Sequence, residues 1–183
     1  MVRKATVEDA ERLAEIHIFG WRNAYRGILA DKFLFDKLRV CRRAENFKKV
    51  VAEGIEELYV AELRGVVAGF LSIGEPRDPD KAKADTLELW AIYVDPALMR
   101  EGVGAELLGF CEQQGLIRGR KEVFLWVLED NVIGRSFYKK HGYRPDGARK
   151  VLERLPSASA KPVAEVRYSK AIAASPVPPL VYF

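Results

Sequence analysis

The chain of 183 residues has few residues of the kinds that bind metals or form redox centres. It contains 2 His and 2 Cys, and because Cys41 and Cys111 lie far apart there is no CxxC motif and no metal-ligand spacing. No apolar run approaches the roughly eighteen residues of a membrane helix, and no signal peptide opens the chain. We therefore expect no metal, no membrane partner and a cytoplasmic location.

Neither sign of charge dominates the sequence. The 30 Lys and Arg residues against 26 Asp and Glu give a formal net charge of +4, and the 49% hydrophobic composition is that of a globular domain. Basic residues cluster in 39–49 and 135–150, but acidic residues or helical spacing interrupt both clusters. We expect solvated helix faces there and no nucleic-acid surface.

The most informative segment is a glycine-containing loop that follows a strand-like run. Thr86–Val94 is rich in aromatic and β-branched residues, and Pro96 ends the run because proline cannot donate to a sheet ladder. Gly102 and Gly104 fall where helical spacing begins at Val103. Glycine there lets backbone N–H groups approach an anion at the start of a helix, so the segment predicts a phosphate-bearing ligand.

Two widespread phosphate-binding loops do not fit this segment. A Walker A loop ends in Lys-Ser or Lys-Thr, and neither follows the glycines. A Rossmann fingerprint requires a third glycine, whereas Glu106-Leu107 follows Ala105 here.

The segment Met99-Arg100-Glu101-Gly102-Val103-Gly104 instead resembles motif A of the GCN5-related N-acetyltransferases, whose pattern is Gln/Arg-x-x-Gly-x-Gly/Ala. Met99 departs from the usual Gln or Arg at the first position. Downstream, the strand-like 125–128 is followed by Asn131 at a helix start and by Tyr138 seven residues later, which is similar to the second half of that family. The resemblance runs in order over roughly residues 2–171.

Periodicity and turn residues predict the order β-α-α-β-β-β-α-β-α-β-β, an α/β layer arrangement with an exposed loop at 75–84. The resemblance implies one acetyltransferase domain over residues 1–172, with a mixed, mostly antiparallel sheet flanked by helices. It also implies a V-shaped split between the fourth and fifth strands. Residues 173–183 are a Pro-rich C-terminal tail, whose apolar end would either dock on a surface, which we favour, or be disordered.

The resemblance implies that acetyl-coenzyme A lies in this split as the co-substrate. Backbone groups of Ile92-Tyr93-Val94 would bind the pantetheine arm in the manner of an added strand. The pyrophosphate would be held by the amides of Arg100, Glu101, Gly102, Val103, Gly104 and Ala105. Asn131 has two interpretations, a plain helix N-cap or a side-chain contact to the coenzyme arm.

Tyr138 is the predicted catalytic acid and also a predicted coenzyme-binding residue. A phenol has a pKa of about 10, close enough to the roughly 8.5 of a thiol for it to protonate the departing coenzyme A thiolate. Glu88 matches the general base of the histone-acetylating branch, or else is a charged residue near the exposed start of a strand. The base of the ribosomal-protein-acetylating branch falls at Trp126, which cannot accept a proton.

The acceptor would contact Trp21, Tyr25 and Arg26, although this aromatic cluster equally suits packing of a helix onto the sheet. Glu129 and Asp130 could attract a cationic acceptor. The predicted reaction is acetyl transfer to a primary amine of a small molecule by direct attack in a ternary complex, because neither cysteine lies in the motifs. The alternatives are a non-catalytic acyl-coenzyme A binding module and an enzyme acting on protein or peptide amines. The family resemblance also allows a homodimer.

Overall fold

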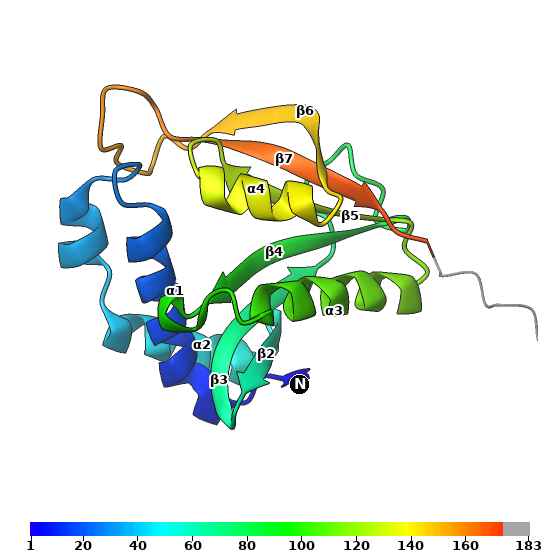
Figure 1. Cartoon of the computed structure of the whole chain (residues 1–183), viewed down its shortest axis with the longest axis horizontal. Coiled ribbons are helices and arrows are strands. Elements are labelled where there is room, and N and C mark those ends of the chain that lie inside the picture. The colour runs from blue at the N-terminus through cyan, green and yellow to red at the C-terminus, as the bar shows by residue number, and fades with distance from the viewer. Residues whose placement is uncertain (174–183) are drawn as a thin grey trace, which may run out of the picture.

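The computed structural model describes residues 1–173 (Figure 1). The strands are β1 (Val2–Lys4), β2 (Glu57–Leu63), β3 (Val66–Gly74), β4 (Thr86–Val94), β5 (Glu122–Leu128), β6 (Arg144–Val151) and β7 (Ala164–Ala171). The helices are α1 (Ala10–Ala24), α2 (Val40–Glu53), α3 (Val103–Ile117) and α4 (Val132–Lys140), with short turns η1 (Val7–Asp9), η2 (Phe33–Lys37) and η3 (Pro96–Leu98). The predicted order of helices and strands is confirmed.

The seven strands form one mixed sheet in the order β1-β2-β3-β4-β5-β7-β6. All neighbours are antiparallel except β4 and β5, which run parallel. Their pairing extends only from Thr86 opposite Glu122 to Leu89 opposite Leu125. Beyond that point the two strands diverge toward α1 (Figure 1). The predicted split between the fourth and fifth strands is confirmed.

A bulge in β4 marks the point of divergence. Ser72 of β3 faces Ala91 and Ile73 faces Leu89, so Trp90 is an extra residue in β4. A bulge bends its strand and increases its twist, which turns the second half of β4 away from β5. Gly74 makes room for the Trp90 ring, because a Cβ at that position would lie 2.3 Å from a ring atom.

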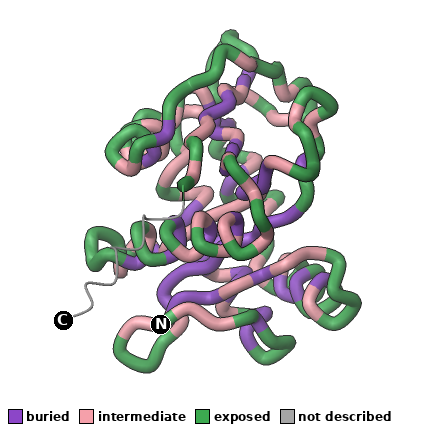
Figure 2. The backbone as a smooth tube through the Cα atoms, turned by 90° about the vertical axis from the view of Figure 1, so that its right-hand side faces the viewer, coloured by how far each residue is buried: buried purple, intermediate pink, exposed green. Residues whose placement is uncertain are grey.

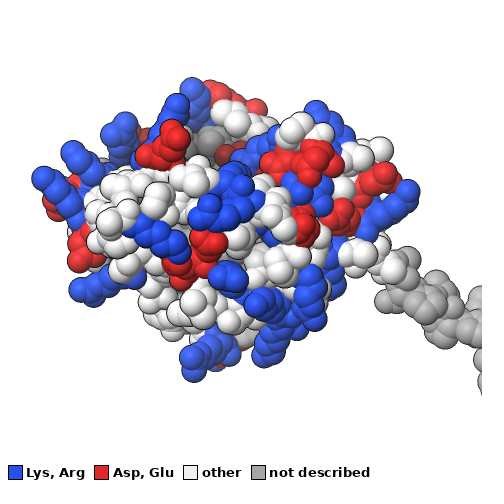
Figure 3. Space-filling model, turned by 90° about the horizontal axis from the view of Figure 1, so that it is seen from above, with Lys and Arg blue, Asp and Glu red and all other residues white. Residues whose placement is uncertain are grey.

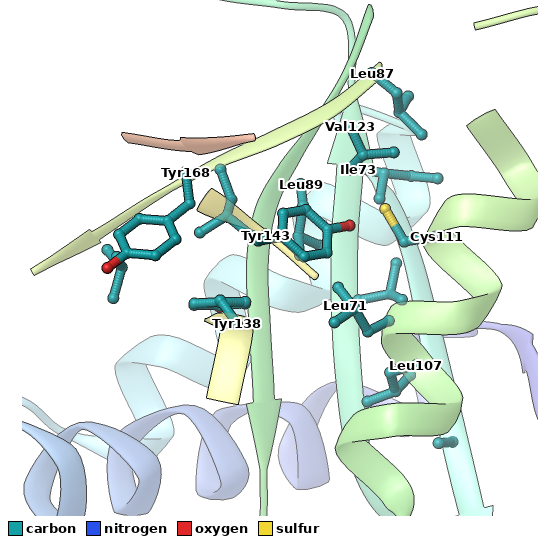
Figure 4. Packing of buried hydrophobic residues seen from close by; sticks show 14 of the residues in the cluster. Leu71, Ile73, Leu87, Leu89, Leu107, Cys111, Val123, Tyr138, Tyr143 and Tyr168 are labelled. Carbon is teal, nitrogen blue, oxygen red and sulfur yellow. The ribbon is translucent and has the colours of Figure 1, made fainter. Parts of the chain in front are cut away.

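The two faces of the sheet carry separate hydrophobic clusters. Leu107 and Cys111 of α3 are fully buried, and Figure 4 shows them next to Leu71 and Ile73 of β3. On the opposite face α1 and α2 bury a second cluster that includes Phe47. Burying each such side chain contributes about 1.5–3 kcal/mol. Figure 2 shows buried positions through the interior of the molecule and exposed positions at its outer turns.

The loop at 75–84, which the sequence predicts to be exposed, is in part held against the sheet. The side chains of Asp78 and Lys81 are only 18% and 11% exposed. Asp78 accepts hydrogen bonds from Trp126 Nε1 at 2.9 Å and from Arg167 at 2.8 Å. The prediction of an exposed loop is wrong at these positions, because ion pairs to distant strands replace water as the partner of the charges.

The helices and the surface charges can be compared with the sequence-based predictions. Within residues 1–173 no helix is long and apolar enough to cross a membrane. Lys and Arg side chains lie intermingled with Asp and Glu on the face in Figure 3. The predicted docking of the C-terminal tail falls at 174–183, outside the described residues.

Candidate active site

Asp95 fixes the end of β4 and so the start of the glycine loop. Its Oδ1 accepts a hydrogen bond from Ala97 N at 2.8 Å and caps η3, whose first residue is Pro96. Its Oδ2 pairs with Arg12 of α1, which also donates from Nε to the carbonyl oxygen of Val67 at 3.0 Å. No motif in the sequence indicates a role for Asp95 or Arg12. An Asp directly before a Pro is nevertheless a known helix-start signal.

The loop between η3 and α3 brings the six predicted pyrophosphate-binding residues together. Arg100 and Gly102 have φ values of 67° and 86°, both in the left-handed region. Gly102 is the N-cap of α3, a helix of 15 residues, so the amides of the first turn have no partner within the helix. Val103 is buried in the core, whereas Arg100 and Glu101 are exposed.

Gly104 allows α3 and α4 to approach each other beside this loop. A Cβ on Gly104 would lie 3.3 Å from the ring of Phe137 on α4 and 3.6 Å from Val94 at the end of β4. The glycine therefore serves helix packing as well as any approach of a ligand to the backbone.

The three β4 residues predicted to bind the pantetheine arm lie beyond the end of the pairing with β5. The side chains of Ile92 and Val94 pack against the α3 cluster. Tyr93 points to the other face, where its hydroxyl accepts a hydrogen bond from Trp21 Nε1 at 2.8 Å. Burial raises the pKa of Tyr93.

Asn131 is the N-cap of α4, as one of its two interpretations requires. Its Oδ1 accepts a hydrogen bond from Gly134 N at 3.0 Å. Gly134 suits this cap, because a Cβ there would lie 2.7 Å from Asn131 Nδ2. Asn131 Nδ2 donates to no other residue that the structure describes.

Tyr138 points from α4 into the core near the split (Figure 4). Its hydroxyl makes no hydrogen bond to any residue in 1–173. Burial raises the pKa of Tyr138 above its ordinary value, and Tyr93 and Cys111 raise it further. A phenol is protonated at neutral pH already at its ordinary pKa of about 10, which is the state required of a proton donor, and the raised pKa makes it a weaker acid toward the departing thiolate.

Glu88 is buried, and the interpretation of Glu88 as an exposed charge is wrong. Its carboxylate is 2% exposed. It accepts hydrogen bonds from Arg77 N at 2.8 Å, Nε at 3.1 Å and Nη2 at 2.6 Å. The guanidinium of Arg77 in turn lies over the ring of Trp90, 4.9 Å from its centroid. Glu88 thus ties the loop at 75–84 to the bulge in β4.

The predicted acceptor residues lie at the C-terminal end of α1. Trp21 and Tyr25 pack edge to face with ring centroids 5.2 Å apart, and both contact a cluster that contains Leu128 of β5. Arg26 is exposed and lines a surface hollow of about 430 Å³ together with Ser157 and other residues of the loop between β6 and β7. The cluster packs the helix onto the sheet and also borders the open end of the split.

Glu129 and Asp130 are both engaged in ion pairs. Glu129 binds Arg149 at 2.9 Å, and Asp130 binds Lys161 at 2.7 Å. Cys111 is buried, which raises the pKa of its thiol, and Cys41 is exposed on α2. No cluster of three or more His, Cys, Asp or Glu that could hold a metal occurs among residues 1–173.

Comparison with known proteins agrees with this geometry. The sequence matches the acetyltransferase (GNAT) family over residues 22–143. An uncharacterized N-acetyltransferase of Bacillus subtilis, YuaI, is 31% identical over 131 residues, 71% of this chain and 72% of the relative. The spermidine N(1)-acetyltransferase of Thermoplasma acidophilum is 26% identical over 84% of this chain and 95% of its own length.

Solved structures share the fold. The PaiA N-acetyltransferase of Thermoplasma acidophilum, solved with coenzyme A, superposes with a TM-score of 0.69 at 23% identity, covering 93% of this chain and 98% of that one. A ribosomal-protein-alanine N-acetyltransferase of Brucella melitensis has a TM-score of 0.69 at 20% identity, with coverages of 93% and 99%. The chain belongs to the acetyltransferase (GNAT) family. It is an N-acetyltransferase that uses acetyl-coenzyme A as co-substrate.

Proposed function

We propose that the protein transfers the acetyl group of acetyl-coenzyme A to a primary amine of a small molecule. The observation that carries this proposal is the hydroxyl of Tyr138, which has no hydrogen-bond partner within residues 1–173. Tyr138 belongs to the same cluster as Leu89 and Leu125, the last paired residues of β4 and β5. The aromatic end of α1 reaches the diverging half of β4 through the hydrogen bond from Trp21 to Tyr93, and its rings would bind the amine. The relative named as a spermidine acetyltransferase, which acts on a small amine, adds support.

The reaction would proceed by direct attack in a ternary complex. The amine lone pair forms the C–N bond at the thioester carbonyl, and the C–S bond then breaks. Tyr138 gives its proton to the departing thiolate, while the amine loses a proton to a base. Neither cysteine is suited to carry the acetyl group, because Cys111 is buried in the core and Cys41 lies on α2.

The donor would occupy the split as the family resemblance implies. Backbone groups of Ile92-Tyr93-Val94 would pair with the pantetheine arm, since β5 has left that edge of β4. The amides of Arg100, Glu101, Gly102, Val103, Gly104 and Ala105 would hold the pyrophosphate at the start of α3. Asn131 Nδ2 would contact the coenzyme arm while Oδ1 caps α4.

Glu88 remains our candidate for the base, and it would act through water. Three hydrogen bonds from Arg77 occupy its carboxylate, so an amine has little room to contact it directly. A bridging water can carry the proton from an amine that does not contact the carboxylate directly.

Replacing Tyr138 by Phe tests the proposal. We expect kcat to fall on the order of a hundredfold in a thiol-release assay with a panel of small amines, because the thiolate loses its proton donor. The affinity for coenzyme A, measured by calorimetry, should change far less than kcat. Tyr143→Phe is the matched control, since Tyr143 is also buried and its hydroxyl also has no partner within residues 1–173.

The two alternative functions predict different results. A non-catalytic acyl-coenzyme A binding module would bind the coenzyme and release no thiol with any amine. An enzyme for protein amines would release thiol with peptides and not with the small-molecule panel. An undiminished kcat in Tyr138→Phe would remove the proposed acid.

A further inference from the structure

We propose that Trp126 and Glu165 bind a second ammonium group of the acceptor, so that diamines and polyamines are the preferred class of acceptor. This inference rests on the proposed function, because it assumes that the amine to be acetylated lies near Tyr138. The observation behind it is that the chain already places an ammonium group of its own, that of Lys150, between these two side chains.

The position of Lys150 defines the geometry of the cation site. Its Nζ lies 3.4 Å from Glu165 Oε2 and 3.9 Å from the centroid of the Trp126 ring. A carboxylate together with an aromatic face is a favourable environment for an ammonium group. Lys150 lies on the edge strand β6, and its side chain is 44% exposed, so another cation can displace it at little cost.

Glu165 lies at the acceptor end of the molecule. In the sheet it is directly opposite Leu128 of β5, so the two side chains share one face. Leu128 is buried in the same cluster as Trp21 and Tyr25 at the end of α1. The carboxylate is 22% exposed, so it is partly accessible to solvent.

The neighbouring carboxylates already form ion pairs with other side chains. Arg167, 8% exposed, lies beside Trp126 and binds Asp78, Asp80 and Asp146 at 2.6–2.8 Å. Glu129 is held by Arg149 through two hydrogen bonds. Glu165, by contrast, has only the longer contact to the ammonium group of Lys150 among the ion pairs of the described residues.

The end of α1 links this side of the sheet to the diverging half of β4, because Trp21 Nε1 donates to the hydroxyl of Tyr93 at 2.8 Å. Burial raises the pKa of Tyr25 well above its ordinary value, and Tyr93, Tyr138 and Glu165 each raise it further. A diamine with one end at Glu165 could present its other end toward Tyr138.

Calorimetric titration in the presence of coenzyme A tests the inference, with the diamine putrescine and the monoamine n-butylamine as probes. We expect the wild-type protein to bind putrescine at least tenfold more tightly. Glu165→Gln should bring the two affinities within about twofold. Lys150→Met should strengthen putrescine binding, because it removes the competing cation. Glu153→Gln is the matched control, since it removes an exposed carboxylate close to Lys150 and should leave both affinities unchanged.

The outcomes separate this inference from the proposed function. Equal affinities for the two amines in the wild-type protein, or a preference that survives in Glu165→Gln, would overturn the cation site even if small amines are acetylated. A preference for putrescine that depends on Glu165, without any thiol release, would uphold the site and overturn the proposed function.

Discussion

His17 is a buried histidine that the proposed reaction does not use. Arg43 donates to its Nε2 at 3.2 Å, so the proton of the neutral ring is on Nδ1, which has no partner among residues 1–173. Its ring stacks on Trp21 with centroids 5.2 Å apart. Burial, assisted by the charge of Arg43, lowers the pKa of His17 from 6.5 to about 3.

This histidine should make the protein less stable in mild acid. Because its folded pKa is lowered, the unfolded chain binds a proton below about pH 6.5 that the folded protein does not bind until about pH 3. Stability therefore falls as the pH falls through this window. At pH 5 the loss due to His17 is about 2 kcal/mol.

Urea unfolding of the wild-type protein and of His17→Gln at pH 7 and pH 5 measures this effect. Gln can still accept the hydrogen bond from Arg43 but does not titrate. The difference in unfolding free energy between the two pH values should be about 2 kcal/mol smaller in the variant. Equal differences would show that His17 does not titrate in this window.

Variants of Glu88 and of Arg77 distinguish a catalytic role of Glu88 from a structural one. Glu88→Gln removes the charge from the buried contact and Arg77→Ala removes its donor, and each should destabilise the protein by about 1–3 kcal/mol. Only Glu88→Gln also removes a base. We expect this variant to have a kcat at least tenfold below that of Arg77→Ala, and its pH–rate profile to lose the acid limb. Equal kcat values for the two variants would show that Glu88 only anchors the loop at 75–84 and is not the base.

At the scale of the element, the bulge at Trp90 determines where β4 leaves β5. Gly74→Ala would place a methyl group against the Trp90 ring, so it should destabilise the protein by about 1–3 kcal/mol. Gly109→Ala is the control, since its Cβ would meet open space on the exposed side of α3 and should stabilise the helix by about 0.5–1 kcal/mol. Chemical denaturation measures both. If Gly74→Ala leaves the free energy of unfolding unchanged, the bulge can shift to make room for the methyl group.

The elements and the loop could be predicted from the sequence because their signals are local. Helical spacing after Val103, the proline at position 96 and the glycines at 102 and 104 all act within a few residues of their effects. The bulge at Trp90 depends on a register between two strands, and the Glu88–Arg77 contact depends on how a loop folds back. Such pairings are set by tertiary structure, so no pattern along the chain could reveal them.

Across the whole molecule, the split divides the sheet into two parts that one hydrophobic cluster joins. Strand pairing between the parts ends at Leu89 and Leu125. The cluster around Cys111 nevertheless contains side chains of β3 and β4 from one part and of β5 and α4 from the other. Exposing Cys111 therefore requires both parts to come apart, and we expect one cooperative unfolding transition.

The two cysteines make this cooperativity measurable. In native conditions a thiol reagent should modify exposed Cys41 quickly and Cys111 only during global opening, because Cys111 is fully buried and burial raises its pKa. Coenzyme A at about one hundred times its Kd stabilises the folded state by about 2.7 kcal/mol. When opening is fast relative to labelling, that should slow modification of Cys111 about a hundredfold and leave Cys41 unchanged. If the coenzyme leaves Cys111 labelling unaffected, the part of the core around α3 opens independently of the proposed coenzyme site.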